Sequence, residues 1–104
     1  MDKKIIKSLK EYKKKISHDI KVKQMIFFGS RAKGKLHKYS DIDLIIVSPE
    51  FKKQRYIHRS LDLYRKWNLD LPVDLLCYTP KEMTERKKAK WGVVQEAMKT
   101  GIEI

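Results

Sequence analysis

Three aspartates beside strand-like apolar runs are the residues of this chain best suited to chemistry. Asp41 and Asp43 lie at the start of the apolar run 44–47, and Asp74 lies in a second run, 72–78. Alternate side chains of a strand share one face, so Asp41 and Asp43 are predicted to lie on the same side, roughly 7 Å apart. Carboxylates of this kind bind Mg²⁺, and a pair of ions stabilises the attacking and leaving oxygens of a phosphoryl displacement. The three acids therefore indicate a metal-dependent phosphoryl-transfer site.

A glycine-serine pair forms a second part of such a site, which complements the three acids. Gly29 and Ser30 follow the apolar run 25–28 and precede the basic residues Arg31 and Lys33. Glycine lets the backbone turn sharply beside a ligand, and serine can cap a helix and donate its hydroxyl. The exposed N–H groups of a helix N-terminus favour anions. We expect this turn to bind the phosphates of a nucleoside triphosphate, with Arg31 and Lys33 adding positive charge.

The run 29–34 (GSRAKG), followed by 40–44 (SDIDL), resembles the signature of the minimal nucleotidyltransferases of the DNA polymerase β superfamily. Either motif alone is common, but the two at this spacing, with a third acid in a later strand, are specific. The resemblance extends along nearly the whole chain. This sequence differs from the family pattern at Lys33, where relatives often carry arginine, so the bidentate contact that a guanidinium makes with phosphate is lost there.

The resemblance implies a role for each matching residue. Gly29 and Ser30 correspond to the pair that contacts phosphate, and Asp41 and Asp43 to the carboxylates that hold two Mg²⁺ ions. Asp74 corresponds to a third acid beside the attacking hydroxyl, where it would help to activate that group.

The same resemblance implies an activity and a partner. Family members transfer a nucleoside monophosphate, here AMP from ATP, to a hydroxyl. Small members act as antitoxins of HEPN-type ribonuclease toxins, with a toxin tyrosine as acceptor. Two alternatives remain open: a binding subunit that neutralises its partner by contact without catalysis, and transfer to an RNA 3′ hydroxyl or to a small alcohol. A salt-dependent shift of RNA would favour the RNA acceptor.

Length and composition predict one nucleotidyltransferase domain over residues 1–104, since a chain of this size fits a single core. Its longest apolar runs are four residues, too short for a membrane span. The single cysteine, Cys77, excludes an internal disulfide, and the expected location is the cytoplasm. Oligomeric state stays open, with both homo-oligomers and hetero-oligomers allowed.

The net charge of +12 is concentrated in the first third, where residues 1–38 hold 13 basic and 3 acidic side chains. Clustered lysines can attract nucleic acid. They also surround an apolar stripe of Ile5, Leu9, Tyr12 and Ile16, which is typical of a surface helix docked on a core. No series of aromatic residues accompanies the lysines, so the solvated helix is favoured over a nucleic-acid surface.

The remaining pattern predicts an α/β fold with a small mixed three-stranded sheet flanked by helices, as in the palm of polymerase β. Ile57, Leu61 and Tyr64 form one stripe of the predicted central helix, and Thr79 begins a capping box that precedes another helix. Gly101 is expected to end the last helix. We expect helices at 3–17, 30–34, 54–67, 80–90 and 92–100, and strands at 22–28, 42–47 and 72–78.

Overall fold

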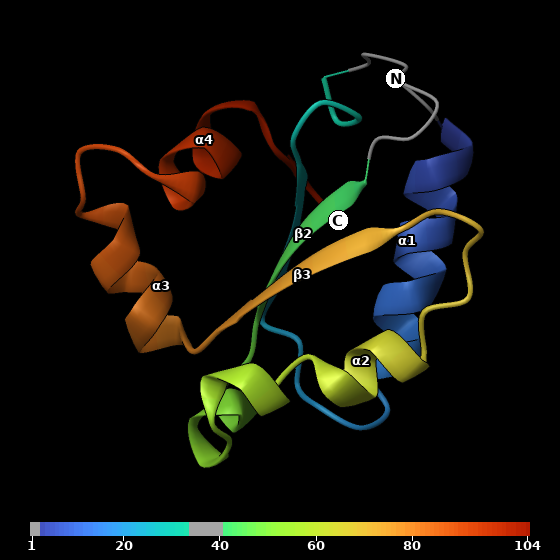
Figure 1. Ribbon diagram of the computed structural model, residues 1–104, viewed down its shortest axis with the longest axis horizontal. Helices are drawn as coiled ribbons and strands as arrows, with labels where there is room; N and C mark the ends of the chain where they lie inside the picture. The colour runs from blue at the N-terminus through green and yellow to red at the C-terminus, as the bar shows by residue number, and fades with distance from the viewer. Residues whose placement is uncertain (1–2, 34–40) are drawn as a thin grey trace.

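The computed structural model describes residues 3–33 and 41–104, which form a mixed sheet with helices on both faces (Figure 1). The helices are α1 (Lys3–Ile16), α2 (Leu61–Arg65), α3 (Pro80–Lys87) and α4 (Val93–Thr100), with short 3-10 helices η1 (Pro49–Lys53) and η2 (Tyr56–His58). The strands are β1 (Gln24–Phe28), β2 (Ile42–Val47), β3 (Val73–Tyr78) and β4 (Ile102–Glu103).

The sheet has the order β3-β2-β1-β4. β1 is antiparallel to both β2 and β4, whereas β2 and β3 are parallel. The parallel pair requires a crossover, and the segment with η1, η2 and α2 provides it. This topology confirms the predicted mixed α/β fold and brings the starts of β2 and β3 to the same end of the sheet.

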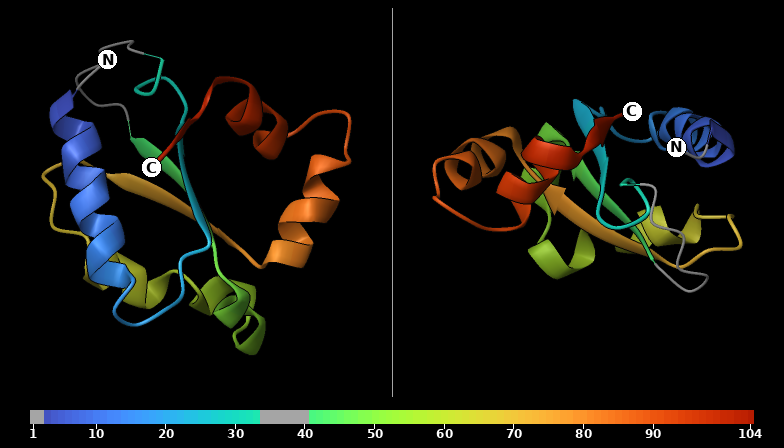
Figure 2. Two further views of the ribbon diagram at one scale, coloured as in Figure 1. Left: turned by 180° about the vertical axis from the view of Figure 1, so that it is seen from behind. Right: turned by 90° about the horizontal axis from the view of Figure 1, so that it is seen from above.

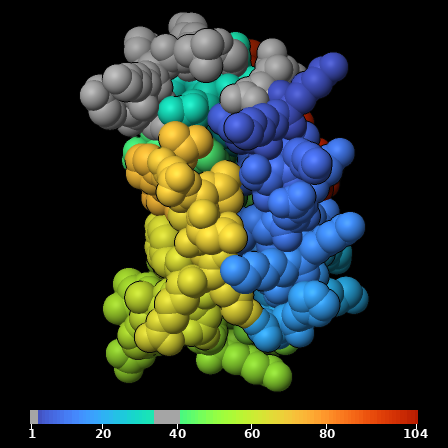
Figure 3. Space-filling model, turned by 90° about the vertical axis from the view of Figure 1, so that its right-hand side faces the viewer, coloured from blue at the N-terminus to red at the C-terminus, as the bar shows by residue number. Residues whose placement is uncertain are grey.

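One face of the sheet is covered by α1 and α2, which lie side by side on the surface in Figure 3. The lysine-rich helix α1 buries the four residues of its predicted stripe, Ile5, Leu9, Tyr12 and Ile16. The Tyr12 hydroxyl donates to the Leu63 carbonyl at 2.7 Å, and the Tyr12 ring meets the edge of Trp67 at 5.0 Å between ring centroids. The prediction of a surface helix docked on the core is therefore confirmed.

The opposite face is covered by α3 and α4, as the two views of Figure 2 show. Met83 of α3 and Val94 and Ala97 of α4 pack against Ile45 and Val47 of β2. The predicted capping box starts α3: Thr79 accepts from the Glu82 N–H at 3.2 Å, and Glu82 accepts from the Thr79 N–H at 2.8 Å. None of the helices in the described ranges is long and apolar enough to cross a lipid bilayer.

The predicted continuous helix over 54–67 is wrong. The segment forms η2 and the five-residue helix α2, and its predicted stripe faces outward, with Ile57 71% and Leu61 50% exposed. The buried residues are instead Arg59 and Leu63. Arg59 Nε approaches the carbonyl of Gln54 at 3.4 Å, an oxygen that a continuous helix would have given to the N–H of His58. The Gln54 carbonyl thus faces the Arg59 side chain and takes no part in a helix.

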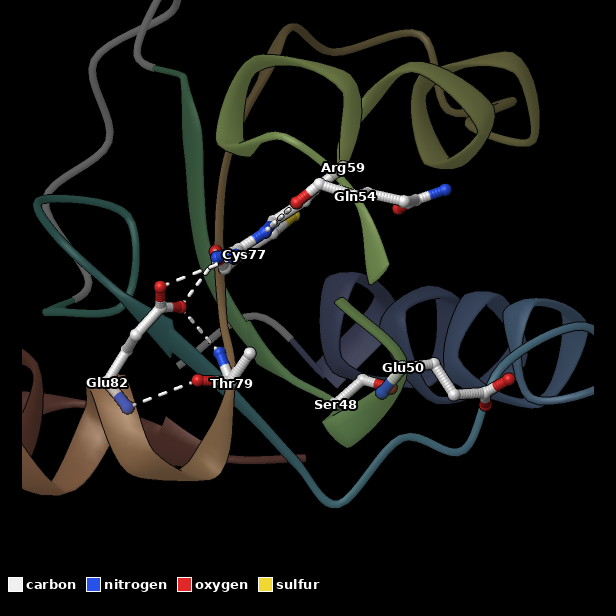
Figure 4. Close-up of polar contacts among 7 residues, drawn as sticks. All are labelled: Ser48, Glu50, Gln54, Arg59, Cys77, Thr79 and Glu82. Atoms are coloured by element: carbon white, nitrogen blue, oxygen red, sulfur yellow. Dashed lines mark hydrogen bonds and ion pairs between the residues drawn. The ribbon is translucent and has the colours of Figure 1, made fainter. Parts of the chain in front are cut away.

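Arg59 lies against the end of β3 and the start of α3 (Figure 4). Its guanidinium donates to the Cys77 carbonyl at 3.2 Å and to both carboxylate oxygens of Glu82, at 2.5 and 3.3 Å. β3 is an edge strand, and such edges need cover because their backbone groups can pair with other chains. Arg59 covers the Cys77 carbonyl, and the Tyr64 hydroxyl accepts from the Leu75 N–H at 3.2 Å.

The fourth strand, β4, was not among the three predicted strands. The last helix ends at Thr100 and Gly101 follows it, as predicted. The chain then returns along β1, where Phe27 pairs with Ile102, and the Ile104 N–H donates to the Met25 carbonyl at 2.9 Å. A two-residue strand has no detectable period in the sequence, so only the pairing with β1 reveals it.

Candidate active site

The strand register gathers the predicted acids at one end of the sheet. Asp43 lies opposite Phe28, the last residue of β1, because β1 and β2 are antiparallel. Asp43 is also the register partner of Asp74, because β2 and β3 are parallel. Asp41 precedes β2 by one residue and is exposed, as is Asp74, while Asp43 is half-buried. Asp43 and Asp74 therefore lie side by side on neighbouring strands, and Asp41 lies just before the start of β2.

The acids lie on the sheet face that carries α3 and α4. Along β2, Asp43 alternates with Ile42 and Leu44, which point into the core under α1. Asp43 therefore shares its face with Ile45, which packs in the core under α4.

Gly29 follows β1 directly and lies against Asp43. Its φ is +90°, a conformation that side-chain-bearing residues rarely adopt. A Cβ on Gly29 would lie 2.2 Å from Oδ2 of Asp43, well inside van der Waals contact. Both the backbone conformation and the closeness of Asp43 therefore favour glycine here, and the predicted phosphate turn lies directly against one of the predicted metal ligands, Asp43.

The turn after Gly29 is shorter than the predicted helix over 30–34. The Lys33 N–H donates to the Gly29 carbonyl at 3.2 Å, which closes one helical turn, and no helix is formed in 30–33. Gly34 lies outside the described residues. Ala32 is buried in the core and holds the turn in place, while Ser30 and Arg31 are half-buried. The described part of this segment therefore has no helix N-terminus, and the phosphate-type turn consists of Gly29 with the half-buried residues Ser30 and Arg31.

The charges at this end of the sheet are mostly of one sign. Burial, followed by the nearby carboxylates of Asp74, Asp41 and Glu96, raises the pKa of Asp43. Within 3–33 and 41–104, none of the ion pairs involves Asp41, Asp43 or Asp74. The carboxylates therefore repel one another, which favours the binding of a cation between them.

Glu96, on α4, is a residue of this region that the sequence analysis missed. Its carboxylate forms an ion pair with the Lys33 ammonium, with Nζ and Oε1 3.0 Å apart. The two residues are 63 positions apart and belong to no common motif, so nothing in the sequence links them. Lys33, which the sequence predicts to lie beside the bound phosphates, thus extends toward α4.

The donor set fits the metal that the sequence predicts. Carboxylate oxygens, with water and substrate phosphates, are what Mg²⁺ prefers. As placed in the described residues, no three acidic, histidine or cysteine side chains converge closely enough to enclose an ion. Such closed cages are unusual for Mg²⁺, which is held by one or two carboxylates and completes its shell with water and phosphate.

The chain is similar to known proteins along nearly its whole length. The family model for the nucleotidyltransferase domain matches residues 3–104. A Haemophilus influenzae protein named as the protein adenylyltransferase MntA is 39% identical over 75 residues, which cover 70% of this chain and 66% of that protein. The chain thus matches just under two thirds of that relative's length. A Methanocaldococcus jannaschii protein, also named as a protein adenylyltransferase, is 28% identical, with 96% of this chain and 98% of that protein covered.

Two solved structures share the fold. A crystal structure described as a nucleotidyltransferase from Sulfolobus solfataricus superimposes with a TM-score of 0.65 at 21% identity, covering 96% of this chain and 78% of that one. A crystal structure described as a toxin-antitoxin with AMP-PNP superimposes with a TM-score of 0.62 at 25% identity, covering 89% of this chain and 69% of that one. The family model, the two relatives and the shared fold agree: this chain belongs to the nucleotidyltransferase family.

Proposed function

We propose that this protein is an adenylyltransferase that moves AMP from ATP to a hydroxyl of a partner protein, and that the partner is a toxin. The observation that carries the proposal is the contact between Gly29 and Asp43, because it joins a phosphate-type turn to a carboxylate that is the register partner of Asp74. Two relatives named as protein adenylyltransferases support the reaction. The structural neighbour described as a toxin-antitoxin with AMP-PNP supports the partner class.

In this proposal, each site residue has a defined task. The Gly29 backbone and the Ser30 hydroxyl bind the triphosphate, and Arg31 and Lys33 balance its charge. Asp41 and Asp43 hold Mg²⁺, with two ions in all and Asp74 as a further ligand. When bound, Mg²⁺ neutralises the phosphate oxygens and favours the deprotonated form of the attacking hydroxyl.

The chemical step is an in-line displacement at the α-phosphorus. The acceptor oxygen forms a bond to that phosphorus as the bond to the β-phosphate oxygen breaks, and pyrophosphate leaves. The acceptor proton passes to Asp74, which is exposed and so can be reached by a group on another protein. Positioning and charge stabilisation account for most of the catalysis in such transfers.

The proposed partner is a HEPN-type ribonuclease toxin, and the acceptor is one of its tyrosines. AMP attached to that tyrosine would silence the ribonuclease. Residues 1–104 form one nucleotidyltransferase domain in this proposal, and the partner brings its acceptor to the exposed acids Asp41 and Asp74.

The test is a labelling experiment. The purified protein is incubated with Mg²⁺ and α-labelled ATP, with and without the product of any adjacent reading frame as the candidate toxin, and the intact mass of that product is measured. We expect the toxin to gain AMP units with the wild-type protein and none with Asp41→Asn/Asp43→Asn. If the protein binds the toxin tightly but the toxin gains no mass, the proposal is wrong and neutralisation by contact is favoured instead.

Transfer to RNA is the second candidate, because the exposed face of α1 is basic. The only aromatic residue of α1, Tyr12, is buried, so this helix offers no surface on which bases could stack. A salt-dependent shift of RNA, together with label in the RNA, would favour this acceptor over a protein.

A further inference from the structure

The ion pair between Lys33 and Glu96 joins the phosphate-type turn to α4 across the acidic end of the sheet. Its Nζ and Oε1 atoms are 3.0 Å apart, and the two side chains are 38% and 54% exposed. A ligand in solution can therefore reach both side chains. No other basic side chain of the described residues forms an ion pair with Glu96.

Glu96 is fixed by the helix that carries it. Val94 and Ala97, on either side of it in the sequence, are buried against the sheet. At the end of α4 the Gly101 N–H donates to the Ala97 carbonyl at 2.8 Å. The backbone of Glu96 is thus held by α4, and its carboxylate is close enough to Asp43 to contribute to raising the pKa of that group.

Lys33 is likewise held at its backbone. Ala32 is buried and the Lys33 N–H is bonded to Gly29, but the side chain has four flexible bonds. The contact with Glu96 decides where the ammonium lies. A lysine ammonium has three N–H donors, so one can stay on Glu96 while the others bind phosphate oxygens.

We propose that Glu96 is a positioning residue for nucleotide binding, which holds the Lys33 ammonium beside the acidic cluster where the triphosphate binds. The inference rests on the proposed function, because it requires a nucleoside triphosphate at this site. Glu96 is the second anchor of Lys33 and does not itself touch the reacting atoms.

The experiment measures the Kd of MgATP by calorimetry for four single or double variants: Glu96→Gln, Lys33→Met, their combination, and the control Glu85→Gln. The control makes the same change of charge at an exposed position of α3. We expect Glu96→Gln to weaken binding about three- to fivefold, the upper range for an exposed ion pair. Lys33→Met should weaken it about tenfold, and the combination should equal Lys33→Met alone.

A charge exchange separates positioning from a merely structural role. Lys33→Glu/Glu96→Lys restores an ion pair between the same positions. If the pair serves only stability, both the melting temperature and the Kd of MgATP should recover. We expect the melting temperature to recover and the Kd to stay weakened, because the ammonium is then on the wrong element. In steady-state transfer, Glu96→Gln should change KM more than kcat.

Failure of the inference can be told from failure of the proposed function. If the wild-type protein does not bind MgATP, the proposed function is wrong and the inference falls with it. If wild type binds while Glu96→Gln matches Glu85→Gln or binds more tightly, only the inference is overturned. Weakening by Glu96→Gln that persists in the Lys33→Met background would also overturn it, since Glu96 would then act independently of Lys33.

Discussion

The two ends of the sheet carry charge in opposite ways. At one end, the buried guanidinium of Arg59, 7% exposed, is matched by both oxygens of Glu82 and by the Cys77 carbonyl. At the other end, Asp43 and Asp74 are neighbours in register, and neither takes part in an ion pair within the described ranges. The charge of Arg59 is paired within the fold, whereas the carboxylates of Asp43 and Asp74 at the candidate active site are left for a ligand to balance.

The difference gives the two ends opposite responses to pH. The hydrogen bonds from Arg59 lower the pKa of Glu82, so the stability that Glu82 contributes is present above the ordinary carboxyl range and lost as pH falls. Burial and neighbouring acids raise the pKa of Asp43, so its contribution is present at low pH and lost as pH rises through that pKa. Lowering the pH should therefore weaken the contact between Arg59 and Glu82 at one end of the sheet and relieve the repulsion around Asp43 at the other.

Among single substitutions, the largest expected effect is the loss of transfer by Gly29→Ala. The new Cβ would lie 2.2 Å from Oδ2 of Asp43 in a backbone of φ +90°, so the carboxylate or the turn must move. A displacement of about 1 Å in a reacting group can cost about a hundredfold in rate. We expect a loss of that size in kcat/KM for AMP transfer.

The matched control for that variant is Gly92→Ala. Gly92 also has a positive φ, +140°, but it lies at the start of α4 and a Cβ there meets only Gln95, at 3.0 Å. Both variants should lower the melting temperature, and only Gly29→Ala should lose transfer. Equal losses of transfer would mean that backbone strain, and not the contact with Asp43, is responsible.

Arg59→Met tests the end of the sheet where Arg59 is paired with Glu82. Removing the guanidinium leaves the Cys77 carbonyl and Glu82 without their partner, and we expect a loss of about 2 kcal/mol in the free energy of unfolding, measured by urea denaturation. Since Glu82 is partly exposed, Glu82→Gln should cost less. A neutral result for Arg59→Met would show that the pair contributes nothing beyond its own desolvation cost.

Added Mg²⁺ tests the end of the sheet where the carboxylates of Asp43 and Asp74 have no ion-pair partner in the described residues. An ion that binds only the folded protein should stabilise it by about 1.4 kcal/mol at ten times its Kd. We expect a rise in melting temperature for the wild-type protein and none for Asp41→Asn/Asp43→Asn. An equal rise in melting temperature for both proteins would show that the ion binds at another site.

The smallest expected effect is on stability, from Asp43→Asn. Removing this charge relieves repulsion from Asp74 and Asp41, so at neutral pH the variant should be more stable by about 1 kcal/mol or less. The difference should vanish at low pH, where Asp43 is protonated in the wild type. Thermal melts from acidic to neutral pH would measure it, and a destabilised variant at neutral pH would show that Asp43 contributes a bond that outweighs the repulsion.

The prediction of the central helix shows where sequence patterns failed. Ile57, Leu61 and Tyr64 have helical spacing, yet Ile57 and Leu61 are at least half exposed and the helix is broken. The buried guanidinium of Arg59 could not be foreseen, because arginine is rarely buried and its partners Cys77 and Glu82 are 18 and 23 positions away. Short-range spacing does not encode such contacts.

The sequence by itself determined the elements with strong local signals and the residue types of the site. The stripe of α1, the cores of the three longer strands, the capping box at Thr79 and the stop at Gly101 follow from periodicity and turn chemistry. Tertiary structure alone decided the pairing of β4 with β1, the contact of Gly29 with Asp43 and the reach of Glu96 to Lys33. The physical reason is range: helices, strands and caps depend on neighbours within a few residues, whereas these contacts depend on which strands pair and in which direction.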